Sequence, residues 1–140
     1  MAYLLDTCAI SEMVSVKPNE AVLAWFERQP EETLYLSVIT LAEIQKGIHQ
    51  LAAGKRRSRI ESWFYDELLP SFPGRVFQID EPIAATWARM VADLKSQGIV
   101  RPSFDSLIEA TALRHNLILV TRNEKNFSRS QVSILNLWDS

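Results

Sequence analysis

The sequence predicts a single α/β domain, residues 1–140, with a central and mainly parallel β-sheet flanked by α-helices. Short apolar segments alternate with longer segments of helical periodicity, and this alternation is typical of βαβ units. The apolar segment 117–120 contains no polar residue, as expected of a strand buried on both faces. A chain of 140 residues is long enough to build one continuous core.

The predicted strands are short, and the first of them, residues 3–5, ends at Asp6. The residues after Asp6 are small or carry hydroxyls, and they could open a helix. The other predicted strands are residues 34–37, 75–79, 117–120 and 132–136. Capping residues, prolines and glycines set the helix boundaries. The predicted helices run from Asn19 to about Gln29, from Thr40 to Gly54, from Ile60 to Pro70, from Asp80 to Gly98, and from Pro102 to about His115.

Composition excludes several classes of protein. The chain is 47% hydrophobic and 23% charged, as is ordinary for a globular protein. No apolar run approaches the roughly 20 residues that span a bilayer, and Asp6 interrupts the first apolar segment before a signal peptide could form. A single cysteine, Cys8, excludes an internal disulfide, so we expect a cytoplasmic protein without membrane contact.

Three acids stand where the predicted elements would bring them together. Asp6 follows a strand, whose carboxyl end faces the ligand crevice of a parallel sheet. Glu43 and Asp105 fall in the first turns of two predicted helices. Hard cations such as Mg²⁺ prefer oxygen ligands and keep several waters, so a few carboxylates suffice to hold one. The sequence therefore indicates an acidic pocket able to bind a metal.

Each acid also has a plain structural explanation. Thr40 and Glu43 have the spacing of a capping box, in which Glu43 would bond back to its own helix terminus. Asp105 would favour the positive end of a helix dipole, and Asp6 could cap the turn after its strand. The spacing between the three acids is too loose to decide between these alternatives.

Several segments, in this order, resemble the PIN-domain ribonucleases. The resemblance is greatest to the VapC toxins of type II toxin–antitoxin systems, in the FitB-like subgroup. The segments are Leu5-Asp6-Thr7, the run Ser37-Val38-Ile39-Thr40-Leu41-Ala42-Glu43, the run Asp105-Ser106-Leu107-Ile108-Glu109-Ala110-Thr111-Ala112, and Thr121-Arg122-Asn123 with Asn126-Phe127. The resemblance implies the PIN-domain fold and a nuclease that depends on Mg²⁺, or alternatively Mn²⁺.

By position, the resemblance makes Asp6, Glu43 and Asp105 the acidic metal ligands. Thr7 and Thr121 match hydroxyl positions that support ligands or water. It also implies an endoribonuclease that cuts RNA such as tRNA and forms a homodimer. A cognate antitoxin protein would inhibit it, and the toxin and antitoxin could assemble further with DNA.

The chain departs from the family pattern at two positions near these acids. Cys8 replaces a usual asparagine, and Asn126 replaces the usual fourth acid of the loop that begins at Thr121. An amide offers a carbonyl oxygen but no charge, so a second metal should bind more weakly. Glu109, four residues after Asp105 on one helical face, could supply the lost charge or could pair with a nearby arginine.

The expected catalytic set is therefore Asp6, Glu43, Asp105 and Asn126. In the loop after the predicted strand 117–120, Arg122 is a candidate phosphate contact, and Asn123 is a further candidate for support. The alternative function is a PIN-like protein that binds RNA or a protein partner without cutting. A phosphotransfer domain is disfavoured, because no second aspartate lies within two positions of Asp6.

Overall fold

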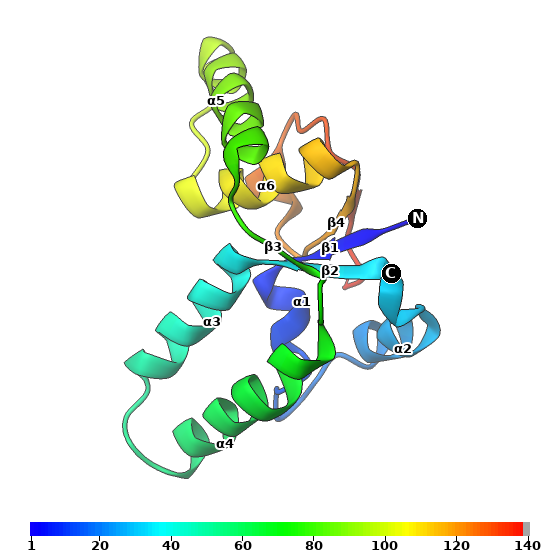
Figure 1. Cartoon of the computed structure of the whole chain (residues 1–140), viewed down its shortest axis with the longest axis vertical. Coiled ribbons are helices and arrows are strands. Elements are labelled where there is room, and N and C mark those ends of the chain that lie inside the picture. Colours follow the sequence, from blue (N-terminus) through cyan, green and yellow to red (C-terminus); the bar gives the residue numbers. More distant parts are fainter. Residues whose placement is uncertain (139–140) are drawn as a thin grey trace.

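A computed structural model describes residues 1–138, so the last two residues of the predicted domain lie outside the described part. Its core is a five-stranded sheet in the order β3-β2-β1-β4-β5 (Figure 1). Every neighbouring pair is parallel, which confirms the predicted α/β class. The strands are β1 (Tyr3–Leu5), β2 (Leu34–Ser37), β3 (Val76–Phe77), β4 (Ile118–Val120) and β5 (Ile134–Leu135).

The central strand β1 divides the hydrophobic core in two. Leu4 and Leu5 are both fully buried, and because neighbouring side chains of a strand point to opposite faces, they belong to different clusters. Leu5 packs on the side of α2 (Glu20–Arg28) and α3 (Val38–Gln50). Leu4 packs on the side of α6 (Ser103–His115).

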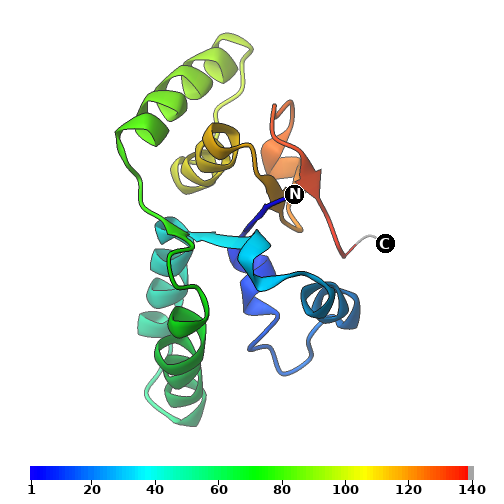
Figure 2. The ribbon, with the colours of Figure 1, turned by 45° about the vertical axis from the view of Figure 1, so that its right-hand side comes forward.

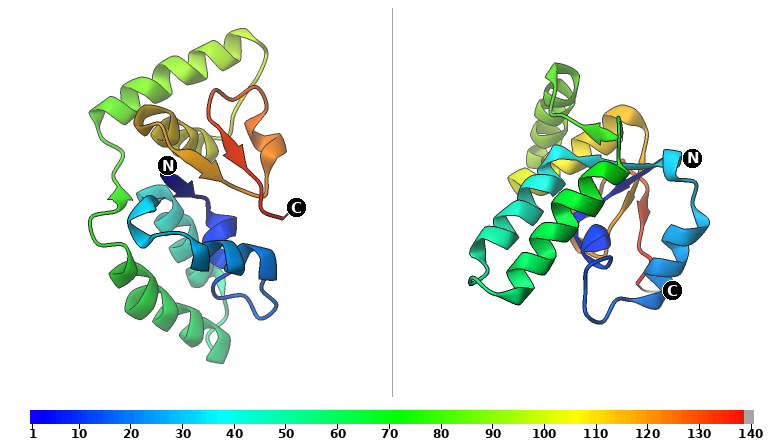
Figure 3. Two further views of the ribbon diagram at one scale, coloured as in Figure 1. Left: turned by 90° about the vertical axis from the view of Figure 1, so that its right-hand side faces the viewer. Right: turned by 60° about the horizontal axis from the view of Figure 1, so that its bottom comes forward.

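The remaining helices extend these two layers. Short α1 (Thr7–Ser11) follows β1 directly, and α4 (Lys55–Trp63) runs beside α3 as an antiparallel arm (Figure 2). On the opposite side, α5 (Glu81–Ser96) packs across α6 (Figure 3). Shorter turns complete the chain: η1 (Glu31–Thr33), η2 (Phe64–Leu68), η3 (Leu69–Ser71) and η4 (Glu124–Phe127). None of the helices in the described part is long and apolar enough to cross a membrane.

Most predicted boundaries are confirmed within a few residues, but two helices begin earlier than expected. The predicted start of α3 at Thr40 is wrong, because Ser37 caps the helix by accepting the N–H of Ile39 at 3.1 Å. α4 begins at Lys55 and not at Ile60, so the basic run 55–59 forms its first turns. β3 and β5 are shorter than predicted, since each is an edge strand paired on one side.

Glu12 joins three distant parts of the chain. Its Oε1 accepts the backbone N–H of Asn19 at 2.9 Å, just where α2 begins. Its Oε2 accepts the indole N–H of Trp138 at 2.6 Å. Glu12 therefore ties the segment after α1 to the start of α2 and to the end of the described chain, which is a structural role.

Candidate active site

Asp6 lies at the edge of the sheet where the carboxyl ends of the strands meet. It is 6% exposed, and its Oδ1 accepts the N–H of Thr7 at 2.8 Å, so it caps α1. Its Oδ2 accepts the hydroxyl of Thr121 at 2.7 Å. Thr121 directly follows β4, the strand that pairs with β1. The two neighbouring strand ends therefore orient both carboxylate oxygens of Asp6.

Glu43 is joined to Asp6 through Thr7. The hydroxyl of Thr7 donates to Glu43 Oε1 at 2.7 Å, while the backbone of Thr7 binds Asp6. The capping-box alternative for Glu43 is wrong, because α3 begins at Val38 and Glu43 lies in its second turn. The carboxylate of Glu43 therefore points to the end of β1 and not back to its own helix terminus.

Asp105 is the third residue of α6, in the predicted first turn. Burial raises the pKa of its carboxyl, and the negative charges of Asp6 and Glu43 raise this pKa further. A carboxylate whose main role was to balance the helix dipole would instead have a lowered pKa. The three predicted acids, which lie at the end of β1, on α3 and on α6, are therefore close enough for the charges of Asp6 and Glu43 to act on Asp105.

The loop after β4 brings the remaining predicted residues to the same edge. Thr121 is fully buried, and its Oγ1 also accepts the N–H of Asn123 at 3.1 Å. Arg122, Asn123 and Asn126 are exposed, and the N–H of Asn126 binds the carbonyl of Asn123 at 3.0 Å. Across residues 1–138, no hydrogen bond joins the Asn126 side chain to the three acids.

Glu109 forms an ion pair with an arginine. This is one of the two roles that the sequence allowed for it. Arg101 Nε donates to Glu109 Oε1 at 2.8 Å, and Arg101 Nη2 donates to Oε2 at 3.2 Å. Both side chains are buried. The charge of Glu109 is thus already offset. Sequence reasoning missed Arg101 altogether, because nothing in the sequence relates it to a residue eight positions later.

Cys8 also stands in the site, although the sequence suggested only a lost contact there. Its Sγ lies 3.9 Å from Asp6 Oδ2 and 3.7 Å from the hydroxyl of Thr121, and it accepts the N–H of Arg122 at 3.3 Å. Burial raises the pKa of this thiol, and the charge of Asp6 raises it further. Cys8 is therefore a neutral thiol at neutral pH, and not a nucleophilic thiolate.

A hydrated divalent cation fits this site. The donors are carboxylate oxygens, which Mg²⁺ and Mn²⁺ prefer, and a cation would relieve the repulsion that raises the pKa of Asp105. In the described chain, no three acidic, thiol or imidazole side chains already enclose a metal position. The buried hydroxyl of Thr40, one turn before Glu43 on α3, has no hydrogen-bond partner within residues 1–138. These features suit a cation that keeps several of its waters.

A groove of about 460 Å³ opens beside the acids. Its lining includes Thr7 and Glu43, together with apolar residues of α3 and α4. Arg56 and Arg59, from the basic first turns of α4, line its wall. The groove therefore joins the acidic pocket to an apolar and basic surface.

Comparison with known proteins identifies the family. The PIN domain matches residues 3–131. The chain belongs to the PIN-domain family. Within it, the chain is similar to the VapC ribonuclease Y4jK of Sinorhizobium fredii, with 39% identity over 97% of both chains. It is also similar to the toxin FitB of Neisseria gonorrhoeae, with 38% identity over 96% of this chain and 97% of FitB.

A solved structure shares the fold closely. The crystal structure of FitAcB from Neisseria gonorrhoeae superposes with a TM-score of 0.92 at 37% identity, covering 99% of each chain. A structure of FitAB bound to a DNA fragment gives a TM-score of 0.91 at 37% identity, covering 97% of this chain and 95% of that one. The resemblance of this chain to VapC and FitB toxins, expected from the sequence, is confirmed.

Proposed function

We propose that this PIN-domain protein is a metal-dependent endoribonuclease and the toxin of a type II toxin–antitoxin system. The observation that carries the proposal is the proximity of Asp6, Glu43 and Asp105. Thr7 joins Asp6 to Glu43 by hydrogen bonds, and burial together with the charges of these two acids raises the pKa of Asp105. The relatives named as VapC ribonuclease and as toxin FitB support the reaction and the biological role.

In this proposal, Asp6, Glu43 and Asp105 hold Mg²⁺, or Mn²⁺, directly or through water. Such a metal lowers the pKa of a bound water and offsets charge on the phosphodiester. Thr7 and Thr121 orient the acids through the hydroxyl hydrogen bonds described above. Burial and the charge of Asp6 raise the pKa of the Cys8 thiol, so we do not expect Cys8 to act as a nucleophile, and the proposed reaction is attack of water on the phosphodiester.

The exposed loop after β4 would meet the substrate. Arg122 is a candidate contact for RNA phosphates, and the exposed Asn126 would offer a neutral carbonyl oxygen. Asn123 supports this loop through its backbone bond to Thr121. Since Asn126 carries no charge, we expect a second metal to bind only weakly, or together with an RNA phosphate.

The groove beside the acids suits an antitoxin segment. An apolar stretch of the antitoxin could lie over α3 and α4, and its end could reach Thr7 and Glu43. The similar structure of FitAB bound to a DNA fragment supports a toxin–antitoxin assembly on DNA. We further propose that the toxin forms a homodimer and acts in the cytoplasm, where its RNA substrates are.

The test is RNA cleavage by the purified protein with and without metal. We expect cleavage of structured RNA, tRNA included, in Mg²⁺, loss of cleavage in excess EDTA, and recovery when Mg²⁺ or Mn²⁺ is restored. Equal cleavage in EDTA would contradict the proposal. A second function, RNA binding without cleavage, is favoured by Asn126. In that case a metal titration would leave the RNA intact while a gel-shift assay still detects binding.

A further inference from the structure

The pair formed by Arg101 and Glu109 is unusual for its burial. Their side chains are 3% and 1% exposed, whereas the other ion pair of the described chain, Arg57 with Glu61, lies at the surface. A buried ion pair adds little net stability, because the loss of hydration offsets most of the attraction. Stability alone is therefore a weak explanation for this pair, and its position suggests a further role.

Arg101 joins three segments of the chain. Besides Glu109 on α6, its Nη2 binds the carbonyl of Ser128 at 2.9 Å, at the residue that ends η4. Its guanidinium also lies 5.8 Å from the ring centroid of Phe127, which is buried in the core cluster of α6. Arg101 thus connects the segment before α6, the helix itself and the end of η4.

This connection involves residues close along the chain to two of the predicted site residues. Glu109 is one helical turn after Asp105, and Ser128 is two residues after Asn126. Arg101 and Glu109 also act on Asp105 with opposite sign, since the Arg101 charge lowers the pKa of Asp105 and the Glu109 charge raises it. As a pair they are nearly neutral, so they shape the site through position more than through net charge.

We propose that Arg101 is a positioning residue that holds the Asn126 loop against the helix carrying Asp105. This inference rests on the proposed nuclease function for its catalytic consequence, but its structural part stands independently. It assigns Glu109 to anchor Arg101 and not to replace the missing fourth acid. The loop offers only a neutral amide to a metal, so its fixed placement matters more than it would for a carboxylate.

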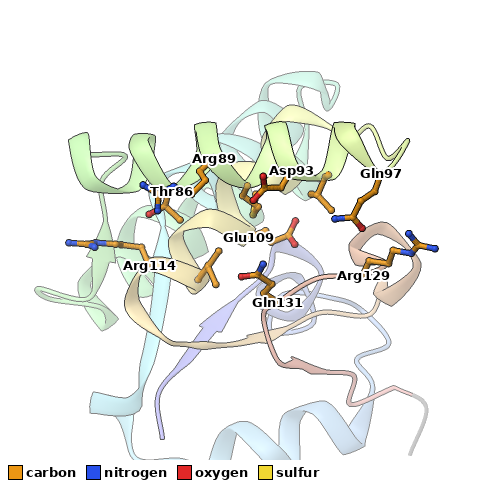
Figure 4. Close-up of a pocket in the computed structure, with 11 residues that line it drawn as sticks. Thr86, Arg89, Asp93, Gln97, Glu109, Arg114, Arg129 and Gln131 are labelled. Atoms are coloured by element: carbon orange, nitrogen blue, oxygen red, sulfur yellow. The ribbon is translucent and has the colours of Figure 1, made fainter.

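A cavity of about 340 Å³ lies next to Glu109. It lies between α5, α6 and the turn after η4, and Glu109 forms part of its wall (Figure 4). Asp93 and Gln131 face the same space from α5 and from that turn. Replacement of Glu109 by glutamine keeps the shape of the side chain, so this variant should fold.

The first experiment compares amide hydrogen exchange in the wild type and in Arg101→Met, without metal. We expect exchange over residues 123–128 to accelerate about tenfold or more, while α2 keeps its wild-type rates. The matched control is Arg75→Met, because Arg75 also binds two backbone carbonyls, of Leu34 and Ser71, and lies 5.3 Å from the ring centroid of Phe72. Arg75→Met should leave residues 123–128 unchanged.

The second experiment measures Mn²⁺ affinity by calorimetry, together with kcat and KM for RNA cleavage. Arg101→Met should lower Mn²⁺ affinity and kcat about tenfold each, with KM changed less than twofold. Arg101→Lys should recover part of both losses, because it keeps the charge and one of the hydrogen bonds. Glu109→Gln should loosen residues 123–128 less than Arg101→Met, since the bond to Ser128 remains.

Hydrogen exchange and Mn²⁺ affinity test the positioning role of Arg101, whereas RNA cleavage by the wild type tests the proposed nuclease function. Unchanged exchange over residues 123–128 and unchanged Mn²⁺ affinity in Arg101→Met would overturn the positioning role. Equal acceleration in α2 and in residues 123–128 would also overturn it, since that pattern indicates a global loss of stability. If Arg101→Met does not fold, Arg101→Lys and Glu109→Gln decide by the same exchange criterion. A wild type that binds Mn²⁺ but does not cut RNA contradicts the proposed function alone.

Discussion

The two halves of the candidate site are held in different ways. In the first half, Asp6 and Glu43 accept hydroxyl hydrogen bonds directly, from Thr121 and Thr7. In the second half, none of the hydrogen bonds found in residues 1–138 reaches the carboxylate of Asp105, whose pKa is raised by burial and by its acidic neighbours. In that half, the buried Arg101 joins the helix that carries Asp105 to the end of η4.

A site built in this way holds two of its acids rigidly and still leaves the third carboxylate available to a cation. Hydrogen bonds from threonine fix the orientation of the first two acids before anything binds, as supporting contacts do for metal ligands. Asp105 keeps both oxygens free of such bonds in the described chain, so it can turn toward a cation. We expect the first half to set geometry and the second half to respond to charge.

The largest effect should come from the first half. Asp6→Asn removes a proposed ligand at the centre of the hydrogen-bond network, so we expect kcat/KM for RNA to fall more than about 100-fold, beyond the usual cost of losing a supporting contact. Steady-state cleavage of a fluorescent RNA measures it. The control is Asp80→Asn, because Asp80 caps α5 by accepting the N–H of Ile83 at 3.0 Å, far along the chain from the acids. Full activity in Asp6→Asn would refute the metal site.

A smaller loss should follow when the acid stays but its orienting hydroxyl is removed. Thr121→Val deletes the donor to Asp6 and keeps a similar shape, so kcat/KM and Mg²⁺ affinity should each fall about 10- to 100-fold. Thr121→Ser keeps the hydroxyl and serves as the matched control. If the valine and serine variants behave alike, the hydroxyl of Thr121 does not orient Asp6, and the first half of the site does not depend on hydroxyl hydrogen bonds.

The three acids could be predicted from the sequence because each stands at a recognisable point, at the end of a strand or near the start of a helix. Asp6 ends an apolar strand, and Asp105 falls in the first turn of a helix that begins after Pro102. Glu43 was predicted as a site residue although the predicted start of its helix was wrong, since Ser37 and Thr40 are both acceptable capping residues. Only the tertiary contact between Thr7 and Glu43 shows which way that side chain turns.

The support behind the site could not be predicted in this way. Arg101 bonds to an acid eight residues later and to the backbone carbonyl of Ser128, and a carbonyl acceptor has no sequence signature. The thiol of Cys8 meets Thr121 across 113 positions, through the pairing of β1 with β4. Contacts of this kind depend on strand order, which follows from packing of the whole chain rather than from local pattern.

If the second half of the site responds to charge, an added carboxylate there should increase the affinity for Mg²⁺. Asn126→Asp restores a carboxylate to the exposed loop. A unit charge about 8 Å from a divalent cation in bulk water is worth about 1 kcal/mol, or roughly fivefold in Mg²⁺ affinity. Calorimetric titration with Mg²⁺ measures the change. Asn123→Asp adds the same charge to the same loop as a positional control. Equal gains in both variants would indicate a diffuse charge effect and no specific place for Asn126.

The smallest effect is that of Asp105→Asn on stability, and its sign should be opposite to the larger effect of Glu109→Gln, one turn further along α6. The folded-state pKa of Asp105 is raised, so its ionised form opposes folding at neutral pH, and Asp105→Asn should raise the melting temperature slightly in EDTA. That gain should shrink as the pH falls through the folded pKa, where the wild-type carboxyl takes up a proton in the fold. Glu109→Gln should do the opposite and lower the melting temperature, because it leaves the buried Arg101 without its charge partner.

Added metal should reverse the order of the wild type and Asp105→Asn. A cation that binds only the folded protein stabilises it in proportion to ln(1 + [L]/Kd), and the wild type should bind more tightly than the variant. Differential scanning calorimetry across a Mg²⁺ series at neutral pH would therefore show the wild-type melting temperature rising past that of the variant. If the two proteins gain equally from Mg²⁺, the ion binds elsewhere, and the raised pKa of Asp105 reflects burial without any part in holding a metal.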